Sequence, residues 1–501
     1  MSEYAQQTVE AFAQARAHYE ETERWLASAE AAALTHAELE DQLGGRGREL
    51  QRLLFQAQLD LRALREQRRG GVTGADGIVR TRVEHGHARL LATVFGQVTV
   101  MRMAYRAAGA PNVHPADAQL NLPAEKQSHG LRRLAAVESA RGSHEDAAAA
   151  ISRATGAGIG KRQVEELARR AAADVGSFYA DRRPGPSADD VVLCLQCDGK
   201  GVVMLPGALR PATAKAAADS RNKLATRLSP GEKSGRKRMA ELAAVYDCQP
   251  QPRTPADVIT PPGRQKPARP ARPKATGKWL TASVTSDIAE VITAGFDEAE
   301  RRDPGHRRTW VALADGNNAQ ISAIEAEAAR RGVSLTILCD FVHVIEYCWK
   351  AAWSFFDPGD PDAETWVADK AAKILHGNAA QVAAGIRRRA TTYGYKGSER
   401  EGADTCAAYL TAKKDYLDYP TALGKGWPIA TGVIEGACRY IVADRLGITG
   451  ARWGLEGAEA ILKLRALIAN GDFDSYWRYH LRREHERVHH ARYRESYVLA
   501  A

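Results

Sequence analysis

The stretch of sequence that most constrains the fold is residues 309–349, which reads as strand, helix, strand and helix. Two short apolar runs, at 309–313 and 333–338, each predict a buried strand. Between them the apolar residues fall at helical spacing, with an asparagine placed to cap the helix and a glycine placed to end it. A strand–helix–strand unit of this length favours two parallel strands joined by a right-handed crossover.

Each of these two predicted strands finishes on an aspartate. Asp315 follows the first strand and Asp340 follows the second. Parallel strands end at the same edge of a sheet, and in open sheets that edge is where ligands bind and chemistry occurs. The sequence therefore predicts two carboxylates at one functional edge.

The composition is that of a globular protein with several domains. The chain has 501 residues, of which 44% are hydrophobic and 26% charged, so it is too long for one core and too apolar to be disordered. No apolar run reaches the roughly 18 residues that a membrane helix needs, and the charged start does not resemble a secretory signal. We therefore expect a cytoplasmic protein that does not bind membranes.

Charge and cysteine content give weaker indications. The formal net charge of +9 is a mild indication of a polyanionic partner. Among the seven cysteines, Cys194 and Cys197 form a C-x-x-C, but on a predicted strand they would point to opposite faces. We expect reduced, buried thiols rather than a zinc site or a disulfide framework.

The segments before residue 183 are predicted to be mostly helical. Residues 1–75 are expected to form helices broken near Gly44-Gly45. Residues 76–128 predict a small antiparallel β-hairpin followed by a loop, because β-branched residues alternate there. Residues 129–182 predict a helix-turn-helix-like segment.

That segment is the first candidate for DNA binding. A glycine-rich turn precedes a helix that would begin with Lys161, Arg162 and Gln163, which is the spacing of a recognition helix. An ordinary helical hairpin with a solvated basic end fits the same residues equally well.

Residues 183–345 are expected to hold the core strands. The predicted elements are strands at 191–197, 202–205 and 239–246 and a helix at 281–302. Asp198 ends the first of these strands, and a Gly-Lys-Gly turn after it predicts a hairpin.

Two basic stretches, residues 206–237 and 249–278, flank the third of these strands. Charge runs of this kind are usually solvated linkers. Two of them around one strand favour contact with a phosphate backbone, and Arg236 and Lys237 are the residues expected to make it.

The predicted order is three strands, helix, strand, helix, strand, a helical insertion at 346–425 and further helices at 426–501. This is the order of the ribonuclease-H-like α/β fold, in which the first and fourth strands are adjacent and parallel. Asp198 and Asp315 would then lie together, and Glu435 would reach them from a helix packed across the sheet, capped at its start by a threonine.

Three carboxylates that converge on one point need hard cations between them, because their mutual repulsion would otherwise raise their pKa values. Asp198, Asp315 and Glu435 are therefore the predicted catalytic and metal-binding residues, holding two Mg²⁺ ions, or Mn²⁺ in their place. Such a pair of ions suits an in-line phosphoryl displacement.

The motifs LQCDGKGV, ALADG and TGVIEGACR, in this order and with the D-F-V-H step at 340–343, resemble those of ISKra-type insertion-sequence DNA transposases. That family belongs to the Asp-Asp-Glu group and has Mutator-like relatives, and the resemblance covers roughly residues 80–475. It implies cleavage of a DNA strand at the element ends, followed by attack of the freed 3′-hydroxyl on target DNA. The implied partners are terminal inverted repeats and target DNA, bound by a homo-oligomer of at least two copies associated with the nucleoid.

The resemblance also assigns a D-x-x-H motif to Asp340 and His343. They are expected to support the metal ligands or to position a DNA strand. Asp340 has two other interpretations, as the cap of its own helix or as the second metal ligand in place of Asp315.

Other interpretations stay open. Asp198 and Asp315 each precede a glycine, so each could form only an Asx turn, and Glu435 could pair with Arg439 on a helix surface. The alternative function is a catalytically inactive DNA-binding regulator derived from a transposase. A third interpretation is an actin-like nucleotide-binding turn at 198–201.

Overall fold

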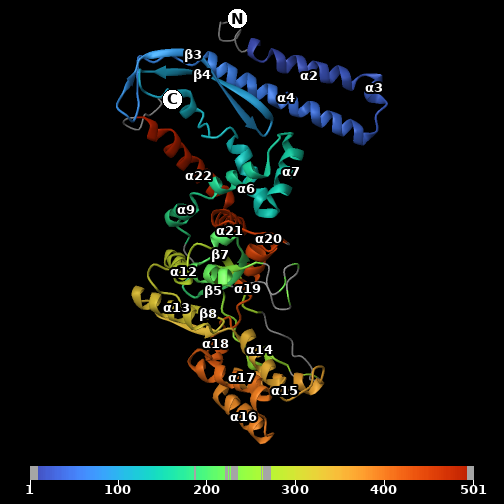
Figure 1. Ribbon diagram of the computed structural model, residues 1–501, viewed down its shortest axis with the longest axis vertical. Coiled ribbons are helices and arrows are strands. Elements are labelled where there is room, and N and C mark those ends of the chain that lie inside the picture. The colour runs from blue at the N-terminus through green and yellow to red at the C-terminus, as the bar shows by residue number, and fades with distance from the viewer. Residues whose placement is uncertain are drawn as a thin grey trace. The chain divides into compact units, whose positions relative to one another are not determined.

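The computed structural model describes residues 9–185, 188–219, 224, 226, 229, 235–260, 262, 272–448 and 450–493. The chain separates into two compact units, whose elements are drawn in Figure 1. The first unit holds residues 1–180 and 472–501, and the second holds residues 181–471. Among the described residues, no helix combines the length and the hydrophobicity needed to cross a membrane.

The first unit begins with the helices α2 (Ala13–Leu26), α3 (Ala29–Ala32) and α4 (His36–Leu64). The predicted break near Gly44-Gly45 is wrong, because both glycines lie inside α4. The break falls before α4, where Thr35 and Glu38 form a capping box. In it, the Thr35 backbone N–H donates to Glu38 Oε2 at 2.9 Å. The 29-residue helix accommodates the cost of about 1 kcal/mol for each interior glycine.

Two very short strands and a long β-hairpin follow these helices. They are β1 (Val72–Thr73), β2 (Val79–Arg80), β3 (Arg82–Thr93) and β4 (Gly96–Arg106). The predicted hairpin is confirmed, since β3 and β4 pair antiparallel around a tight turn between Thr93 and Gly96. The segment predicted as a loop contains a short helix, α5 (Pro115–Gln119).

The rest of the first unit is helical. Its helices are α6 (His129–Arg141), α7 (His144–Thr155), α8 (Lys161–Ala171), α9 (Val175–Asp181) and, from the end of the chain, α22 (Phe473–Val488). Leu131, Ile151, Val164 and Leu167 form the core between α6, α7 and α8. The sequence pattern predicts one helix through residue 179, but the structure interrupts it between α8 and α9.

Buried charges hold α22 against the helices before it. Arg132 is fully buried and makes ion pairs of 2.6 Å with Glu125 and 2.8 Å with Glu484. His480 lies 2.7 Å from Asp174 through its Nδ1. Breaking one member of such a network leaves the others buried without a partner, which makes each member important for stability.

The second unit is built on a five-stranded mixed sheet. Its strands are β5 (Val192–Val203), β6 (Lys237–Cys248), β7 (Ala275–Ser283), β8 (Trp310–Ala314) and β9 (Leu335–Cys339), arranged in the order β7-β6-β5-β8-β9. Strand β6 is antiparallel to both of its neighbours. Strand β8 is parallel to both β5 and β9, which confirms the predicted parallel pair.

The predicted hairpin after Asp198 is wrong, because β5 continues through Gly199 and Gly201 and pairs with β6 throughout. A Cβ at Gly199 would lie 2.8 Å from Glu241 Oε2, and one at Gly201 would meet the Lys237 side chain. These glycines therefore allow close packing of β6 side chains instead of forming a turn.

Strand β7 lies at one edge of the sheet and is third in chain order. The sequence pattern assigned its residues to a linker and to the start of a helix. That helix, α12 (Ile288–Arg302), begins later than predicted because Asp287 caps it and accepts a hydrogen bond from the Glu290 N–H. The predicted segment at 202–205 instead belongs largely to the end of β5.

Helices cover both faces of this sheet. On one face, Leu195 and Cys197 lie near Ile292 and Phe296 of α12. On the other face, Cys194 packs in the core that the later helices share. The alternation confirms that the C-x-x-C cysteines point to opposite faces.

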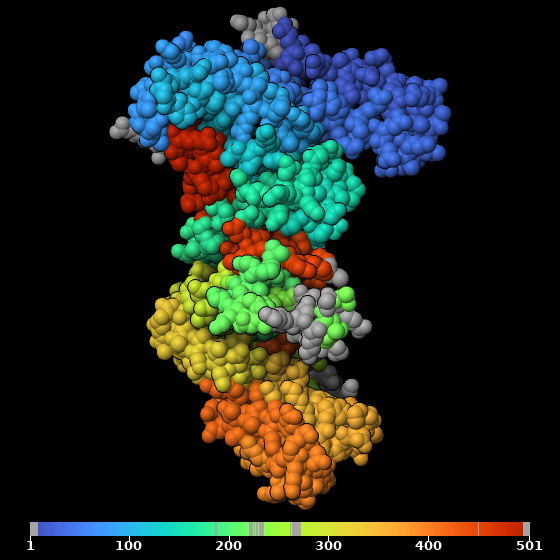
Figure 2. All heavy atoms as spheres, viewed as in Figure 1, coloured from blue at the N-terminus to red at the C-terminus, as the bar shows by residue number. Residues whose placement is uncertain are grey.

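Helix α13 (Asn318–Arg331) connects β8 to β9. The helices that follow β9 are α14 (Phe341–Ala352), α15 (Pro361–Leu375), α16 (Ala379–Thr392), α17 (Glu401–Ala412) and α18 (Tyr419–Gly424). Residues 346–425 contain no strand, as predicted, and all of them are described. The atoms of α15, α16 and α17 form a continuous packed mass (Figure 2).

The two basic stretches are described only in part. The first contains α10 (Pro211–Asp219) and the second contains α11 (Pro255–Val258). Other basic residues of the first stretch, among them Arg221, Lys223, Arg227 and Lys233, lie outside the described residues.

Candidate functional site

The strand ladders bring three aspartates to one level of the sheet. The pairs nearest to them are Gln196 with Leu313, and Ala314 with Cys339. Continued by two residues and by one residue respectively, this register puts Asp198, Asp315 and Asp340 in a row across β5, β8 and β9. Since β5, β8 and β9 are parallel, the row lies toward the carboxyl ends of β8 and β9.

Asp340 is the most enclosed of the three, with no exposed surface. Its backbone N–H donates to the Ala314 carbonyl at 2.8 Å, and its Oδ1 accepts from the Val342 N–H at 2.9 Å. The second bond caps α14, so the capping interpretation is confirmed. Burial raises the pKa of Asp340, and the nearby Glu435 carboxylate acts in the same direction.

Glu435 comes from α19 (Gly432–Ala437), which begins after Thr431. Thr431 holds the expected position, but the predicted side-chain cap is wrong, because its hydroxyl donates to Asp340 Oδ2 instead. The same hydroxyl lies 3.2 Å from Glu435 Oε1. A hydroxyl has one proton, so it can satisfy only one of these two carboxylates at a time.

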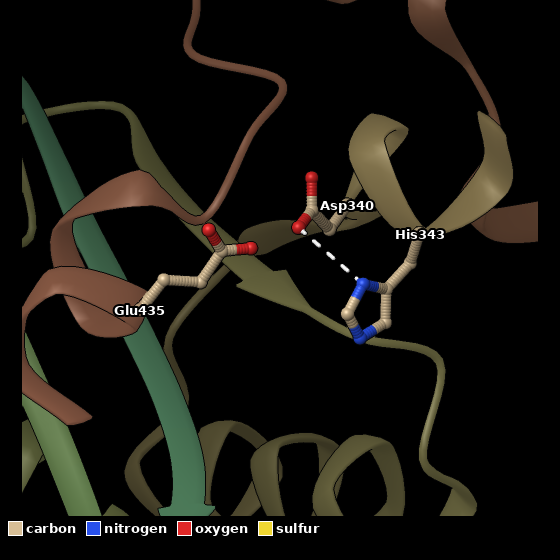
Figure 3. Close-up of side chains that lie close together, drawn as sticks. All are labelled: Asp340, His343 and Glu435. Atoms are coloured by element: carbon tan, nitrogen blue, oxygen red, sulfur yellow. Dashed lines mark ion pairs between the residues drawn. The ribbon is translucent and has the colours of Figure 1, made fainter. Parts of the chain in front are cut away.

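Asp340, His343 and Glu435 form a compact group of possible metal ligands, with atoms that all lie within 4.8 Å of one another. In Figure 3, Glu435 from α19 and His343 from the start of α14 both point toward Asp340. His343 Nδ1 lies 4.0 Å from Asp340 Oδ2 and 3.7 Å from Glu346 Oε2. This Nδ1 atom is buried, and within the described part of the chain it has no hydrogen-bond partner.

This arrangement fits a divalent cation. A cation would satisfy the unpartnered His343 nitrogen and relieve the repulsion between Asp340 and Glu435 that one hydroxyl cannot offset. Carboxylate oxygens suit Mg²⁺ and Mn²⁺, and the imidazole favours a transition metal such as Mn²⁺ over Mg²⁺.

Asp198 lies on the central strand and contacts the helical segment that continues from Glu435. Its Oδ2 accepts from the Cys438 thiol at 3.3 Å, and its Oδ1 accepts from the Gly199 N–H at 2.7 Å. Burial raises the pKa of Cys438, and the carboxylates of Asp198 and Glu435 add to that effect. Both carboxylates therefore lie near the same thiol.

The helix that carries Glu435 is fixed to β5 at two points. Gln196 Oε1 accepts from the Ile434 N–H at 3.0 Å, and Asp198 contacts Cys438 four residues further along the helix. Two residues along a strand span roughly 6.7 Å and four along a helix roughly 6 Å, so the two contacts keep register. Sequence reasoning missed Gln196, although a glutamine inside an otherwise apolar strand was a visible indication.

A π-helical turn, Cys438–Ala443, continues α19 and leads into α20 (Asp444–Leu446). Turns of this type are rare and often occur at functional sites. The Arg439 side chain lies 3.9 Å from Asp444 Oδ1, and in the described part of the chain it makes no ion pair with Glu435. The interpretation of Glu435 as half of a surface ion pair is therefore wrong.

Asp315 sits at the same level of the sheet but is not a member of the compact group. Its Oδ1 accepts from the Asn317 N–H at 2.8 Å, which confirms the Asx-turn interpretation of its local structure. Its carbonyl accepts from the Tyr409 hydroxyl at 3.3 Å, next to Gly316, where a Cβ would collide with that ring. The structure thus brings Glu435 together with Asp340 and His343, and places Asp315 in the adjoining turn.

The predicted DNA-contacting residues lie in both units. Lys161 and Arg162 are exposed at the start of α8, whereas the Gln163 side chain accepts from the Gly160 N–H at 3.2 Å and so caps the helix. Lys237 is exposed at the start of β6, and Arg236 just before it is half-exposed.

Comparisons with known proteins add no family. A scan against protein-family models gives no match, and a search of curated proteins gives none either.

Proposed function

We propose that the chain is a DNA transposase of the Asp-Asp-Glu group, similar to the ISKra-type enzymes, that cleaves DNA at element ends and joins them to target DNA. The observation that carries the proposal is the convergence of Asp340, His343 and Glu435 beside Asp198 at one edge of the sheet. The strand order β7-β6-β5-β8-β9 with β6 antiparallel supports a ribonuclease-H-like core for this site. Two ligand-bearing elements from distant parts of the sequence meet there, which a purely structural turn would not require.

Asp340, His343 and Glu435 would hold one divalent cation, and Asp198 and Asp315 would contribute to a second, Mg²⁺ or Mn²⁺ in each case. Such ions supply Lewis-acid activation of an attacking oxygen and stabilisation of the leaving one. The chain's own contribution is positioning: Gln196 and Asp198 fix the helix of Glu435, and Thr431 links that helix to Asp340.

The proposed reaction has two displacements at phosphorus. In the first, water attacks a backbone phosphate, the bond to the 3′-oxygen breaks, and that oxygen takes up a proton to become a 3′-hydroxyl. In the second, this hydroxyl attacks a phosphate of target DNA and loses its proton, and a target 3′-oxygen leaves. Neither step needs a covalent bond to the protein.

The first unit would bind the DNA ends through α8 and its exposed Lys161 and Arg162. Coordinated cutting of two ends implies at least a dimer, with terminal repeats and target DNA as partners. A protein of this kind would be associated with the nucleoid.

The test uses the full chain, Mn²⁺ or Mg²⁺, and a supercoiled plasmid that carries the DNA flanking the gene. We expect metal-dependent nicking that falls by at least about a hundredfold in Asp198→Asn and Glu435→Gln, since these remove groups that act on the transition state. Asp415→Asn, an exposed carboxylate in the same unit, is the matched control and should leave nicking unchanged. Duplex binding without any nicking by the unaltered protein would favour the DNA-binding regulator instead.

A further inference from the structure

A recess of about 620 Å³ lies in the first unit where α4 ends, beside α5 and β4. Its lining residues include four arginines within eight positions, Arg62, Arg65, Arg68 and Arg69. Gln58, Gln67 and Gln119 add amide groups to the same wall.

The charge of this arginine recess is strongly one-sided. Glu66 is the one acidic residue among those that line it. Its carboxylate accepts from the Met103 backbone N–H at 2.8 Å, so it is directed toward β4 and engaged there. Arg62 and Arg68 are exposed, and in the described part of the chain neither makes an ion pair. The guanidinium groups of Arg62 and Arg68, which share this concave surface, favour an anionic ligand.

The backbone that carries the arginines is held in place. The Arg69 N–H donates to the Tyr105 hydroxyl at 2.8 Å, and Tyr105 is buried in β4. Arg65 follows directly on the last turn of α4. The guanidinium groups therefore project from a fixed frame, which lowers the entropy lost when they bind.

We propose that the arginine recess binds the sugar–phosphate backbone of duplex DNA. Planar guanidinium groups bind phosphate oxygens through paired N–H donors, and the glutamine amides can donate to the sugar and phosphate oxygens as well. No aromatic ring is among the residues that line the recess, so nothing there would stack on a base. The absence of a stacking surface favours a duplex backbone over a single strand or a free nucleotide.

This inference depends on the DNA-binding part of the proposed function and not on its chemistry. It gives the first unit a second set of phosphate contacts, on a different surface element from α8. A protein that bound DNA through both would hold the duplex in one orientation, because phosphate contacts fix register without reading sequence.

The test is fluorescence anisotropy of the full chain with a labelled mixed-sequence duplex of about 30 base pairs across a salt series. We compare Arg62→Gln with Arg68→Gln in one variant against Arg24→Gln with Arg48→Gln in another, which removes two exposed charges from α2 and α4 outside the recess. The recess variant should lower the slope of log affinity against log salt by about 2 and weaken binding by about tenfold at low salt. The control should change affinity by less than about twofold.

Each other outcome overturns a defined part of the argument. Equal losses in the two variants would show only a general charge effect and would contradict the recess. The same titration with a duplex RNA of equal length is the second arm. If the recess variant loses affinity for this RNA but not for the DNA, the recess binds a different partner. If the unaltered chain binds no duplex even at low salt, the DNA partner of the proposed function fails along with the recess.

Discussion

The side-chain amide oxygen of Gln196 accepts a hydrogen bond from the backbone N–H of Ile434, 3.0 Å away, and joins β5 to the helix that carries Glu435. The amide nitrogen of Gln196 donates to the Tyr246 hydroxyl at 2.7 Å. One buried glutamine thus connects β5 and β6 to the start of α19. Gln196 and Ile434 are 238 residues apart along the chain.

Replacing Gln196 with leucine should remove this connection. The Ile434 N–H and the Tyr246 hydroxyl would lose a buried partner, which should lower the free energy of unfolding by about 1–3 kcal/mol. The Mn²⁺ affinity and the nicking rate should fall by about 10- to 100-fold, because Glu435 would no longer be held in place. Gln381→Leu, at an exposed position of α16, is the control and should change neither quantity.

The hydrogen bond that the Thr431 hydroxyl donates to Asp340 predicts a pH effect on metal binding. Burial raises the pKa of Asp340 above its usual 3.8, and the hydrogen bond from Thr431 opposes that rise. In the folded protein without metal, this carboxyl stabilises the fold at low pH and loses that contribution as the pH rises through its raised pKa. A cation that needs the ionised form should therefore bind less tightly as the pH falls toward that value.

Thr431→Val should raise this pKa further, because it removes the donor to Asp340 Oδ2. We expect the midpoint of Mn²⁺ affinity against pH to move upward by about one pH unit, which corresponds to about 1.4 kcal/mol. Paramagnetic resonance of free Mn²⁺ across a pH series measures it. Thr411→Val is the control, since that hydroxyl donates to the Ala407 carbonyl on α17. An unchanged midpoint in Thr431→Val would contradict the argument.

Glu484 predicts a second pH effect, on the stability of the first unit. Burial alone would raise its pKa, but hydrogen bonds from Arg132 and Arg487 outweigh burial and lower the pKa from 4.5 to about 2. A depressed pKa contributes stability above the unfolded value and loses it as the pH falls through the folded value. The contribution should therefore be present above pH 4.5 and disappear by about pH 2.

Thermal unfolding of the full chain and of Glu484→Gln measures this difference. The variant should be less stable by on the order of 2 kcal/mol at neutral pH, and the gap should close as the solution is acidified. Glu486→Gln removes an exposed carboxylate of the same helix, which pairs with Arg483, and should cost well under 1 kcal/mol. A gap between Glu484→Gln and the unaltered chain that stays constant with pH would be incompatible with this account.

Gly402 of α17 packs against the backbone of α14, the helix that Asp340 caps. A Cβ at this position would lie 2.2 Å from the Lys350 carbonyl oxygen. Gly402→Ala should therefore destabilise the second unit by about 1–3 kcal/mol through overpacking. Gly385→Ala, in α16 where a Cβ meets nothing within 4 Å, should instead raise stability by about 0.5–1 kcal/mol. Chemical unfolding distinguishes the two, and equal effects would contradict the packing argument.

Periodicity and capping residues predicted the parts of the fold that depend on local sequence. The unit from β8 to β9 follows its apolar pattern closely, with Asn317 capping α13 and Gly332 ending it at φ 66°. The parallel pairing of β5 with β8 follows from element order, and the structure confirms it.

Local sequence patterns gave wrong predictions where long-range packing decides the structure. Gly199 and Gly201 read as a turn, but they pair with β6 because bulky side chains from that strand occupy the space above them. Strand β7 was missed because its residues follow a Pro-rich basic stretch with no clear strand boundary.

The candidate site shows the same division. Asp198, Asp315 and Glu435 could be selected from predicted strand ends and from a motif, and the register aligns the two aspartates. Asp198, however, lies inside β5 and not at its end. The grouping of Glu435 with Asp340 and His343 depends on how α19 packs, which the hydrogen bonds of Gln196 and Thr431 decide. Local sequence does not encode those contacts, so the sequence favoured Asp315 over Asp340 beside Glu435.

The central claim is that Asp340, His343 and Glu435 hold a divalent cation. A crystal of the full chain soaked in Mn²⁺ tests it directly through anomalous scattering. We expect a peak about 2–2.5 Å from Asp340, Glu435 and His343 Nδ1, with a second peak beside Asp198. A crystal that holds Mn²⁺ only at other carboxylates, or none beside these three residues at saturating concentration, would contradict the account.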